Sequence, residues 1–227
     1  MKTYTIQGRD DGFGGQYQAV MAAIAYCDYN NYKYIHTPFI KMGHDVSIDE
    51  MNHFTGIPST EEKNVIIDVI EEWPKDVHLS RSPDIYYTDT VIQKLRNYYY
   101  STHKPDINTN DIAIHIRRGD VDAVNNSDRY IPNIFYKHLI MFLKKIYPSY
   151  KIVIHSEGKI SDFDDLISDN VYFKLNEDVR KTFHAMVTSN VLVTSISSLS
   201  YSAAILNTNT IFYVPFMHAP LRKWNIL

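Results

Sequence analysis

The sequence predicts an α/β protein built on a mainly parallel, doubly wound sheet. Short apolar runs, typical of buried strands, alternate along the chain with stretches of helical spacing. Several of these runs end in polar or glycine-containing segments, and open parallel sheets bind ligands beyond the carboxyl ends of their strands. Hydrophobic residues make up 44% of the chain and charged residues 22%, which is typical of a folded domain.

The C-terminal half shows this alternation most regularly. Apolar runs predict strands at residues 112–116, 151–155, 171–174, 191–194 and 210–214. Helical spacing predicts helices at residues 133–146, near 162–167, at 177–188 and at 199–206.

The N-terminal half carries a looser form of the same pattern. It predicts strands at residues 3–7, 33–37 and 64–69, and helices at about 16–27 and at 87–100. Residues 42–58 are expected to be irregular, residues 73–83 loop-like, and residues 101–110 a linker. We therefore expect two Rossmann-like lobes facing a cleft, residues 1–105 and residues 106–227.

Composition excludes several classes of function. The formal net charge of −3 over 227 residues leaves no basic excess for nucleic acid. The single cysteine, Cys27, excludes an internal disulfide. No run approaches the ~20 apolar residues of a membrane span, and the N-terminus lacks the apolar stretch of a signal peptide. We therefore expect no membrane span and a cytoplasmic location.

The most informative segment is His115-Ile-Arg-Arg-Gly-Asp120, at the end of a predicted buried strand. The guanidinium forks of Arg117 and Arg118 suit a diphosphate and stay charged at any working pH. Gly119 would let the backbone approach such a ligand closely. One alternative is an ion pair of these arginines with Asp120 or Asp122. Another, a cell-adhesion tripeptide, requires an exposed flexible loop.

Three further segments also follow predicted strands. Ser197 and Ser198 begin a predicted helix, where hydroxyls and free N–H groups can hold an anion, although such serines are also ordinary N-caps. Glu157, after His155-Ser156, could accept hydrogen bonds from a nucleobase edge or be an exposed loop acid. Gly12-Phe-Gly14-Gly15-Gln16 reads as a ligand-contacting turn, but it lacks the dinucleotide spacing and the P-loop lysine.

No metal site is expected. Asp120 with Asp122 and Asp162 with Asp164 form Asp-x-Asp patterns that can hold Mg²⁺ or Mn²⁺. The second pair is better explained as negative charge at a helix N-terminus. The neighbourhood of His44 and His53 has no recognised ligand spacing.

Together these segments resemble the fucosyltransferase superfamily with the HxRRGD motif, which includes α-1,2- and α-1,6-fucosyltransferases. The match spans most of the chain, and its most specific part is the segment from His115 to Asp120. The resemblance implies a two-lobed GT-B glycosyltransferase, inverting and metal-independent, with a reduced N-terminal lobe. It implies a nucleotide-sugar donor without a further cofactor, and a glycan or glycoconjugate acceptor.

The resemblance also implies roles for single residues. Arg117 would grip the β-phosphate, His115 and Glu157 would lie near the ribose or base, and Ser197 and Ser198 would complete the phosphate site. The implied donor site is made of Gly14, Gly15, Gln16, His115, Arg117, Ser156, Glu157, Ser197 and Ser198. GDP-fucose is the donor expected first, although relatives can use others such as UDP-xylose.

The catalytic base does not transfer by motif position, because Asn125 stands where the α-1,6 branch has an acidic residue. Asp120 is the first candidate beside Arg117 and Arg118; the other nearby carboxylates are Asp122, Asp128, Asp10 and Asp11. Two rivals remain: a non-catalytic sugar-nucleotide or glycan-binding protein, and a metal-dependent phosphohydrolase or GT-A enzyme that uses Asp162 and Asp164.

Overall fold

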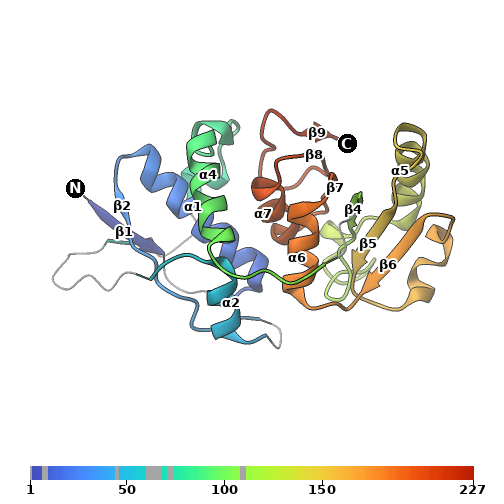
Figure 1. Cartoon of the computed structure of the whole chain (residues 1–227), viewed down its shortest axis with the longest axis horizontal. Coiled ribbons are helices and arrows are strands. Elements are labelled where there is room, and N and C mark those ends of the chain that lie inside the picture. The colour runs from blue at the N-terminus through green and yellow to red at the C-terminus, as the bar shows by residue number, and fades with distance from the viewer. Residues whose placement is uncertain (1, 7–9, 44–45, 60–67, 71–73, 108–110) are drawn as a thin grey trace. The chain divides into compact units, whose positions relative to one another are not determined.

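A computed structural model of the chain describes residues 2–6, 10–43, 46–59, 68–70, 74–107 and 111–227 (Figure 1). The chain divides into two compact units. Unit 1 comprises Met1–Lys104 and Met217–Lys223, and unit 2 comprises Pro105–Phe216 and Trp224–Leu227. None of the helices in the described ranges is long and apolar enough to cross a membrane.

Unit 1 contains a parallel three-stranded sheet in the order β2-β1-β3. Its strands are β1 (Thr3–Ile6), β2 (Lys33–Tyr34) and β3 (Asp68–Ile70). The predicted strand at 33–37 is therefore shorter than expected, and residues 7 and 64–67 of the other two predicted strands lie outside the described residues. Helix α1 (Phe13–Tyr29) is alanine-rich and buried along most of its length.

Four further helices lie in the described part of unit 1. Helix α4 (Asp89–Tyr100) confirms the helix predicted at 87–100, and it buries the predicted apolar residues Ile92, Leu95 and Tyr99. The expectation of irregular structure over 42–58 is wrong, because α2 (Ile48–Thr55) lies there. Short helices α3 (Lys75–His78) and η1 (Pro83–Ile85) replace much of the loop expected at 73–83, of which residue 73 lies outside the described residues.

The C-terminal return segment of unit 1, Met217–Lys223, is fixed by backbone contacts. His218 Nδ1 lies 3.3 Å from the carbonyl oxygen of His78. The amide of Arg222 donates to the carboxylate of Asp84 at 3.1 Å.

Unit 2 contains a parallel six-stranded sheet in the order β6-β5-β4-β7-β8-β9. The strands are β4 (Ile112–His115), β5 (Ile152–Ser156), β6 (Val171–Leu175), β7 (Val191–Val193), β8 (Thr210–Tyr213) and β9 (Asn225–Ile226). Five of them match predicted strands, whereas β9 was not predicted. Because β4 lies between β5 and β7, the sheet is doubly wound, as the alternation predicted.

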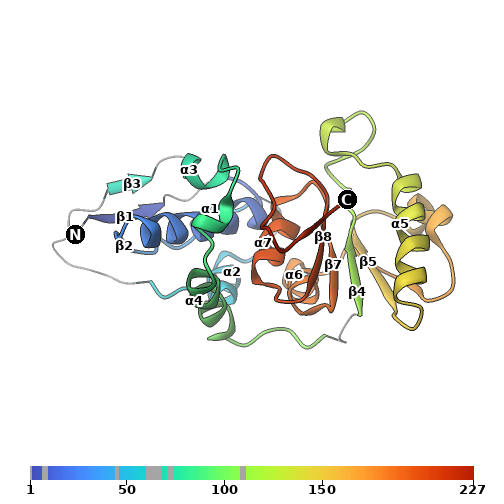
Figure 2. The same cartoon turned by 90° about the horizontal axis from the view of Figure 1, so that it is seen from above.

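Helices cover both faces of this sheet. Figure 2 shows α5 (Asn133–Ile146) on one side and α6 (Val179–Thr188) with α7 (Ser198–Leu206) on the other. The predicted helix near 162–167 is a 3-10 helix, η3 (Ile160–Leu166), on the α5 side. Alternate residues of the strands, including Ile114 and Ile154, form one core with α5, and the intervening residues face α6 and α7.

Candidate functional site

Arg117 lies just beyond the carboxyl end of β4 in unit 2. Its guanidinium donates to Asp120 twice, from Nη2 to Oδ2 at 2.6 Å and from Nε to Oδ1 at 3.3 Å. A third bond runs from Nη1 to the carbonyl oxygen of Ile196 at 3.4 Å, in the turn before α7. The ion pair considered as an alternative therefore exists. It holds the half-buried, charged guanidinium of Arg117 across the carboxyl ends of β4 and β7.

Arg118 has a different environment from its neighbour. Its guanidinium donates to the carbonyl oxygens of Arg117 and Ile131, at 2.8 and 2.9 Å, and to Oδ1 of Asn133 at 2.7 Å. It also lies over the ring of Tyr130, 4.5 Å from the centroid. These contacts hold the loop between β4 and α5 in place. The guanidinium groups of Arg117 and Arg118 therefore have separate partners and do not act as a pair.

His115 is the last residue of β4 and is only 7% exposed. Its Nδ1 lies 2.9 Å from Oγ of Ser195, at the end of β7. Burial lowers the pKa of His115 to about 3, with smaller contributions from His155 and Arg117. At neutral pH this ring is therefore an uncharged hydrogen-bonding group.

The serine turn before α7 is tightly bonded to itself. Ser197 caps the helix, because its hydroxyl accepts from the amide of Leu199 at 3.2 Å, which confirms the N-cap alternative. The amide of Ser197 donates to the carbonyl oxygen of Ser195 at 2.8 Å. Ser198 is the first residue of α7 and is half-buried. Through Ile196 and Ser195, this turn contacts both Arg117 and His115.

The end of β5 adjoins the arginine loop. The hydroxyl of Ser156 donates to the carbonyl oxygen of Ile116 at 2.7 Å. Glu157 is exposed, and its carboxylate lies against Gly119, whose backbone has a φ of 84°. The structure therefore brings together Glu157 and the segment that contains Arg117.

Sequence reasoning missed a second buried histidine and its acidic neighbour. His155 is the register partner of His115 and is 2% exposed. Its Nδ1 lies 3.7 Å from Oε2 of Glu177, and Oε1 of the same carboxylate lies 3.4 Å from Lys174 Nζ. Burial, with Lys174, lowers the pKa of His155 to about 4. The signal for Glu177 was its position just after a predicted strand, the same rule that selected Glu157.

Three other acidic candidates, Asp122, Asp10 and Asp162, also have partners in the structure. Asp122 accepts from the amides of Val124 and Asn125 and from the side chain of Asn125, and these bonds lower its pKa. Asp10 pairs with Lys41 at 2.8 Å. Asp162 accepts from the amide of Lys159 at 2.7 Å, as expected for a helix start. Within the described ranges, no three His, Cys, Asp or Glu side chains are grouped to hold a metal ion.

The glycine segment of unit 1 is helical. The expected turn over residues 12–15 is wrong, because α1 begins at Phe13 and the amides of Gly15 and Gln16 bond to the carbonyl oxygen of Gly12. Gly14 and Gly15 thus lie in the first turn of α1. Gln16 is buried, and its Nε2 donates to the carbonyl oxygens of Asp11 and Lys41 at 2.7 and 2.8 Å. Its side-chain amide therefore joins two segments of unit 1.

The two α/β units, whose described parallel sheets have three and six strands, together with the likeness to WaaC, confirm the expected α/β fold of GT-B type. The chain is similar to the E. coli heptosyltransferase WaaC with ADP-2-deoxy-2-fluoro heptose, at a TM-score of 0.52 and 10% identity, over 100% of this chain and 93% of that chain. WaaC with ADP gives a TM-score of 0.50 at 8% identity, over 100% and 92% of the two chains.

POFUT1 in complex with GDP-fucose gives a TM-score of 0.49 at 10% identity, over 100% of this chain and 97% of that chain, a score too low to add weight. No protein-family model and no curated protein matches the sequence. At such low identity, the likeness to WaaC establishes the fold alone, and the chemistry has to be argued from the residues.

Proposed function

We propose that the protein is an inverting, metal-independent glycosyltransferase that moves a sugar from a nucleoside diphosphate to a glycan hydroxyl. The observation that carries the proposal is the Arg117 fork, a fixed cation at the carboxyl end of β4 beside the α7 turn. Ligands of open α/β sheets bind at such strand ends. In this proposal unit 2 binds the donor and unit 1 the acceptor.

Arg117 stabilises the negative charge that grows on the departing diphosphate. A preorganised donor of this kind contributes about 2.7–4 kcal/mol to the transition state in other enzymes. Because a fixed guanidinium supplies the charge, the step needs no divalent cation. Arg118 acts indirectly, since its contacts hold the loop from which Arg117 projects.

Asp120 is the proposed general base. In the structure its carboxylate is held by Arg117. A diphosphate competes for the same guanidinium donors, so donor binding would release this carboxylate to accept the proton of the acceptor hydroxyl. The transfer then passes the sugar from phosphate oxygen to acceptor oxygen with inversion at the anomeric carbon.

Most of the remaining proposed donor contacts come from residues at the carboxyl ends of strands in unit 2. The neutral ring of His115 and the carboxylate of Glu157 face the ribose and base, while Ser156, Ser197 and Ser198 line the phosphate side. Gly14 and Gly15, in the first turn of α1, and Gln16, which bonds to the segment before it, are also proposed as donor residues. GDP-fucose is the proposed donor because the HxRRGD segment resembles fucosyltransferases; a UDP-sugar such as UDP-xylose is the alternative.

A non-catalytic sugar-nucleotide or glycan-binding protein is the second candidate. It is favoured by the engagement of Asp120 and Asp122 in local bonds and by the amide at Asn125. Such a protein would bind the nucleotide without breaking the glycosidic bond to phosphate.

Thermal-shift titration of the full chain with GDP, UDP and ADP, each with Mg²⁺ or EDTA, tests the binding step. A nucleotide that binds only the folded state raises the melting temperature. We expect a GDP-selective shift that EDTA does not remove and that Arg117→Ala abolishes. A shift seen only with metal would reject the arginine-based mechanism, and an undiminished shift in Arg117→Ala would reject this site. An assay of donor hydrolysis or sugar transfer then distinguishes an enzyme from a non-catalytic binding protein.

A further inference from the structure

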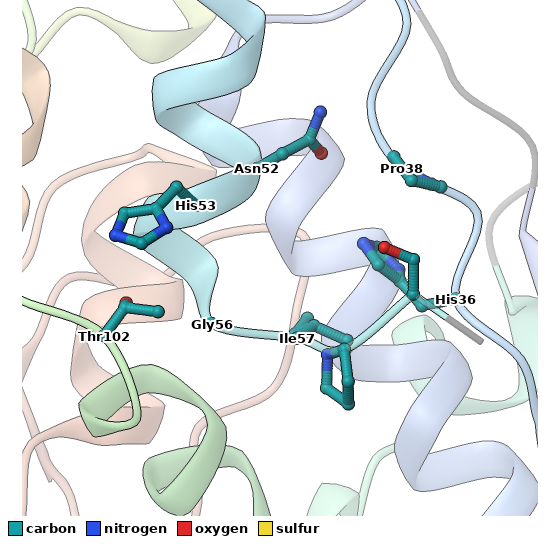
Figure 3. A pocket seen from close by; sticks show the side chains of 9 residues that line it. His36, Pro38, Asn52, His53, Gly56, Ile57 and Thr102 are labelled. Carbon is teal, nitrogen blue, oxygen red and sulfur yellow. The ribbon is translucent and has the colours of Figure 1, made fainter.

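A separate hollow of about 310 Å³ lies wholly within unit 1 (Figure 3). Figure 3 shows His53 and Thr102 on one side of Gly56, and His36 and Pro38 on the other. The volume falls at the lower end of the ~300–1,000 Å³ typical of small-molecule sites. None of the residues proposed to bind the donor lines it.

The wall between α2 and residues 36–39 is fixed by Asn52. Its Oδ1 accepts from the amide of Phe39 at 2.8 Å, and its Nδ2 donates to the carbonyl oxygen of Phe39 at 2.9 Å. Both ends of this side-chain amide are therefore committed to holding the wall.

The floor of the hollow is fixed by Gly56, which ends α2 in the left-handed conformation, with a φ of 67°. A Cβ at this position would lie 1.9 Å from the carbonyl oxygen of Tyr98 in α4, so only glycine allows this approach. The hydroxyl of Ser101 donates to the carbonyl oxygen of Gly56 at 3.2 Å. The hollow is thus preformed, which lowers the entropic cost of binding.

Lys104 bonds to Thr102 of the wall and is not among the residues that line the hollow. Its ammonium donates to the carbonyl oxygen of Phe54 at 2.8 Å and to Oγ1 of Thr102 at 2.7 Å. It also lies over the rings of Phe54 and Tyr99, at 5.0 and 4.4 Å from their centroids. The positive charge of Lys104 therefore interacts with these groups of the protein.

The described lining combines polar side chains with apolar surface. No Asp, Glu, Lys or Arg is among the described residues that border it. His36 is buried, its Nδ1 lies 3.2 Å from the hydroxyl of Tyr34, and burial lowers its pKa to about 4. The hydroxyls of Ser59 and Thr102 can each donate and accept, as sugar hydroxyls do. Ile57 and two prolines supply apolar surface for the carbon face of a ring.

We propose that this hollow binds one uncharged sugar unit of the acceptor glycan. The proposal rests on the proposed glycosyltransferase function and names the chemistry of its acceptor. Among the described residues of the lining, an anionic ligand would find no Lys or Arg side chain, and a cationic ligand would find no carboxylate. A neutral ring with several hydroxyls leaves no charge unpaired.

Saturation-transfer NMR on the full chain tests this with the methyl glycosides of galactose, N-acetylglucosamine, fucose and xylose. We expect at least one glycoside to give a signal that Ser59→Trp removes by filling the hollow. His53→Ala changes an exposed position of the lining. It should lower the affinity for the same glycoside at least threefold. Ser82→Trp is the matched control, since Ser82 is also an exposed serine of unit 1 but does not line the hollow.

Nucleotide binding separates the two proposals. If no glycoside binds the wild type while the GDP or UDP shift persists, the sugar site is wrong and the proposed function stands. If the glycoside signal persists in Ser59→Trp, or a nucleotide displaces it, the hollow is not the acceptor site. A protein that binds a glycoside at the hollow but no nucleotide would overturn the proposed transfer, and with it the acceptor role.

Discussion

The carboxylate of Glu157 occupies the space that a side chain at position 119 would need. A Cβ built on Gly119 would lie 1.8 Å from Oε2 of Glu157 and 2.9 Å from its Cδ. Gly119 also has a φ of 84°, which L side chains rarely adopt. The positive φ therefore favours glycine in the arginine loop, and a side chain there would also displace the exposed carboxylate of Glu157.

We expect Gly119→Ala to destabilise the protein and to weaken nucleotide binding together. The positive φ alone costs about 1–3 kcal/mol, and the displaced carboxylate adds to this. The displacement also moves the loop that carries Arg117. Urea unfolding measures the first effect, and thermal-shift titration with GDP and UDP measures the second.

The double variant Gly119→Ala/Glu157→Ala separates the two constraints. Removing the carboxylate should recover the steric part of the loss but not the conformational part, so the two substitutions will not be additive. Gly43→Ala is the control, because a Cβ there meets nothing closer than 3.4 Å. Additive effects, or a Gly119→Ala variant as stable as the wild type, would contradict the geometry.

Arg117→Lys tests whether the fork, and not only the charge, binds the diphosphate. Lysine keeps the charge but loses the planar pair of donors. A charge-assisted hydrogen bond contributes about 1.5–3 kcal/mol, so we expect nucleotide affinity to fall roughly 10- to 100-fold. Calorimetric titration with the nucleotide that stabilises the wild type provides the measurement; unchanged affinity would argue against the role of Arg117.

Arg118→Lys should give the opposite profile. It removes bonds to Ile131 and Asn133 and the contact with Tyr130, so stability should fall by about 1–3 kcal/mol. Nucleotide affinity of the folded protein should fall less than in Arg117→Lys, because Arg118 acts only by holding the loop from which Arg117 projects. A large loss of affinity at full stability would mean that Arg118 contacts the ligand directly.

The sequence allowed the fold to be predicted best where strand and helix alternate strictly. In unit 2 the buried runs are continuous and aliphatic, so the strands that end at His115 and Ser156 could be predicted to within one residue at either end. In unit 1, helix α2 was missed because it is short and its apolar face is narrow. Ser47, Glu50 and Gly56 carry the start and stop signals that could have revealed it.

The candidate site was predictable in location but not in detail. Strand ends of a parallel sheet meet at one edge, so the proximity of His115, Ser156 and the serine turn followed from the topology. The directions of the side chains did not follow, because the side chains of two adjacent loop residues have no fixed orientation relative to each other. Arg118 therefore bonds to its own loop while Arg117 pairs with Asp120, a difference that only tertiary structure reveals.

The buried histidines His115 and His155 should make stability depend on pH. Their pKa values fall from the ordinary 6.5 to about 3 and about 4, because burial disfavours the charged ring. Below pH 6.5 the unfolded state therefore binds protons that the folded state does not. Stability is complete above about pH 6.5 and is lost as the pH falls toward the folded values, by about 1.4 kcal/mol per pH unit for each ring.

His115→Gln should reduce this slope by about 1.4 kcal/mol per pH unit between pH 5 and 6, and His155→Gln should do the same. Urea unfolding at several pH values measures the slope. NMR titration supplies the matching observation for single groups, since both rings should remain neutral down to pH 5. A wild-type slope in either variant would mean that the ring titrates alike in the folded and unfolded states, and that burial does not hold it neutral.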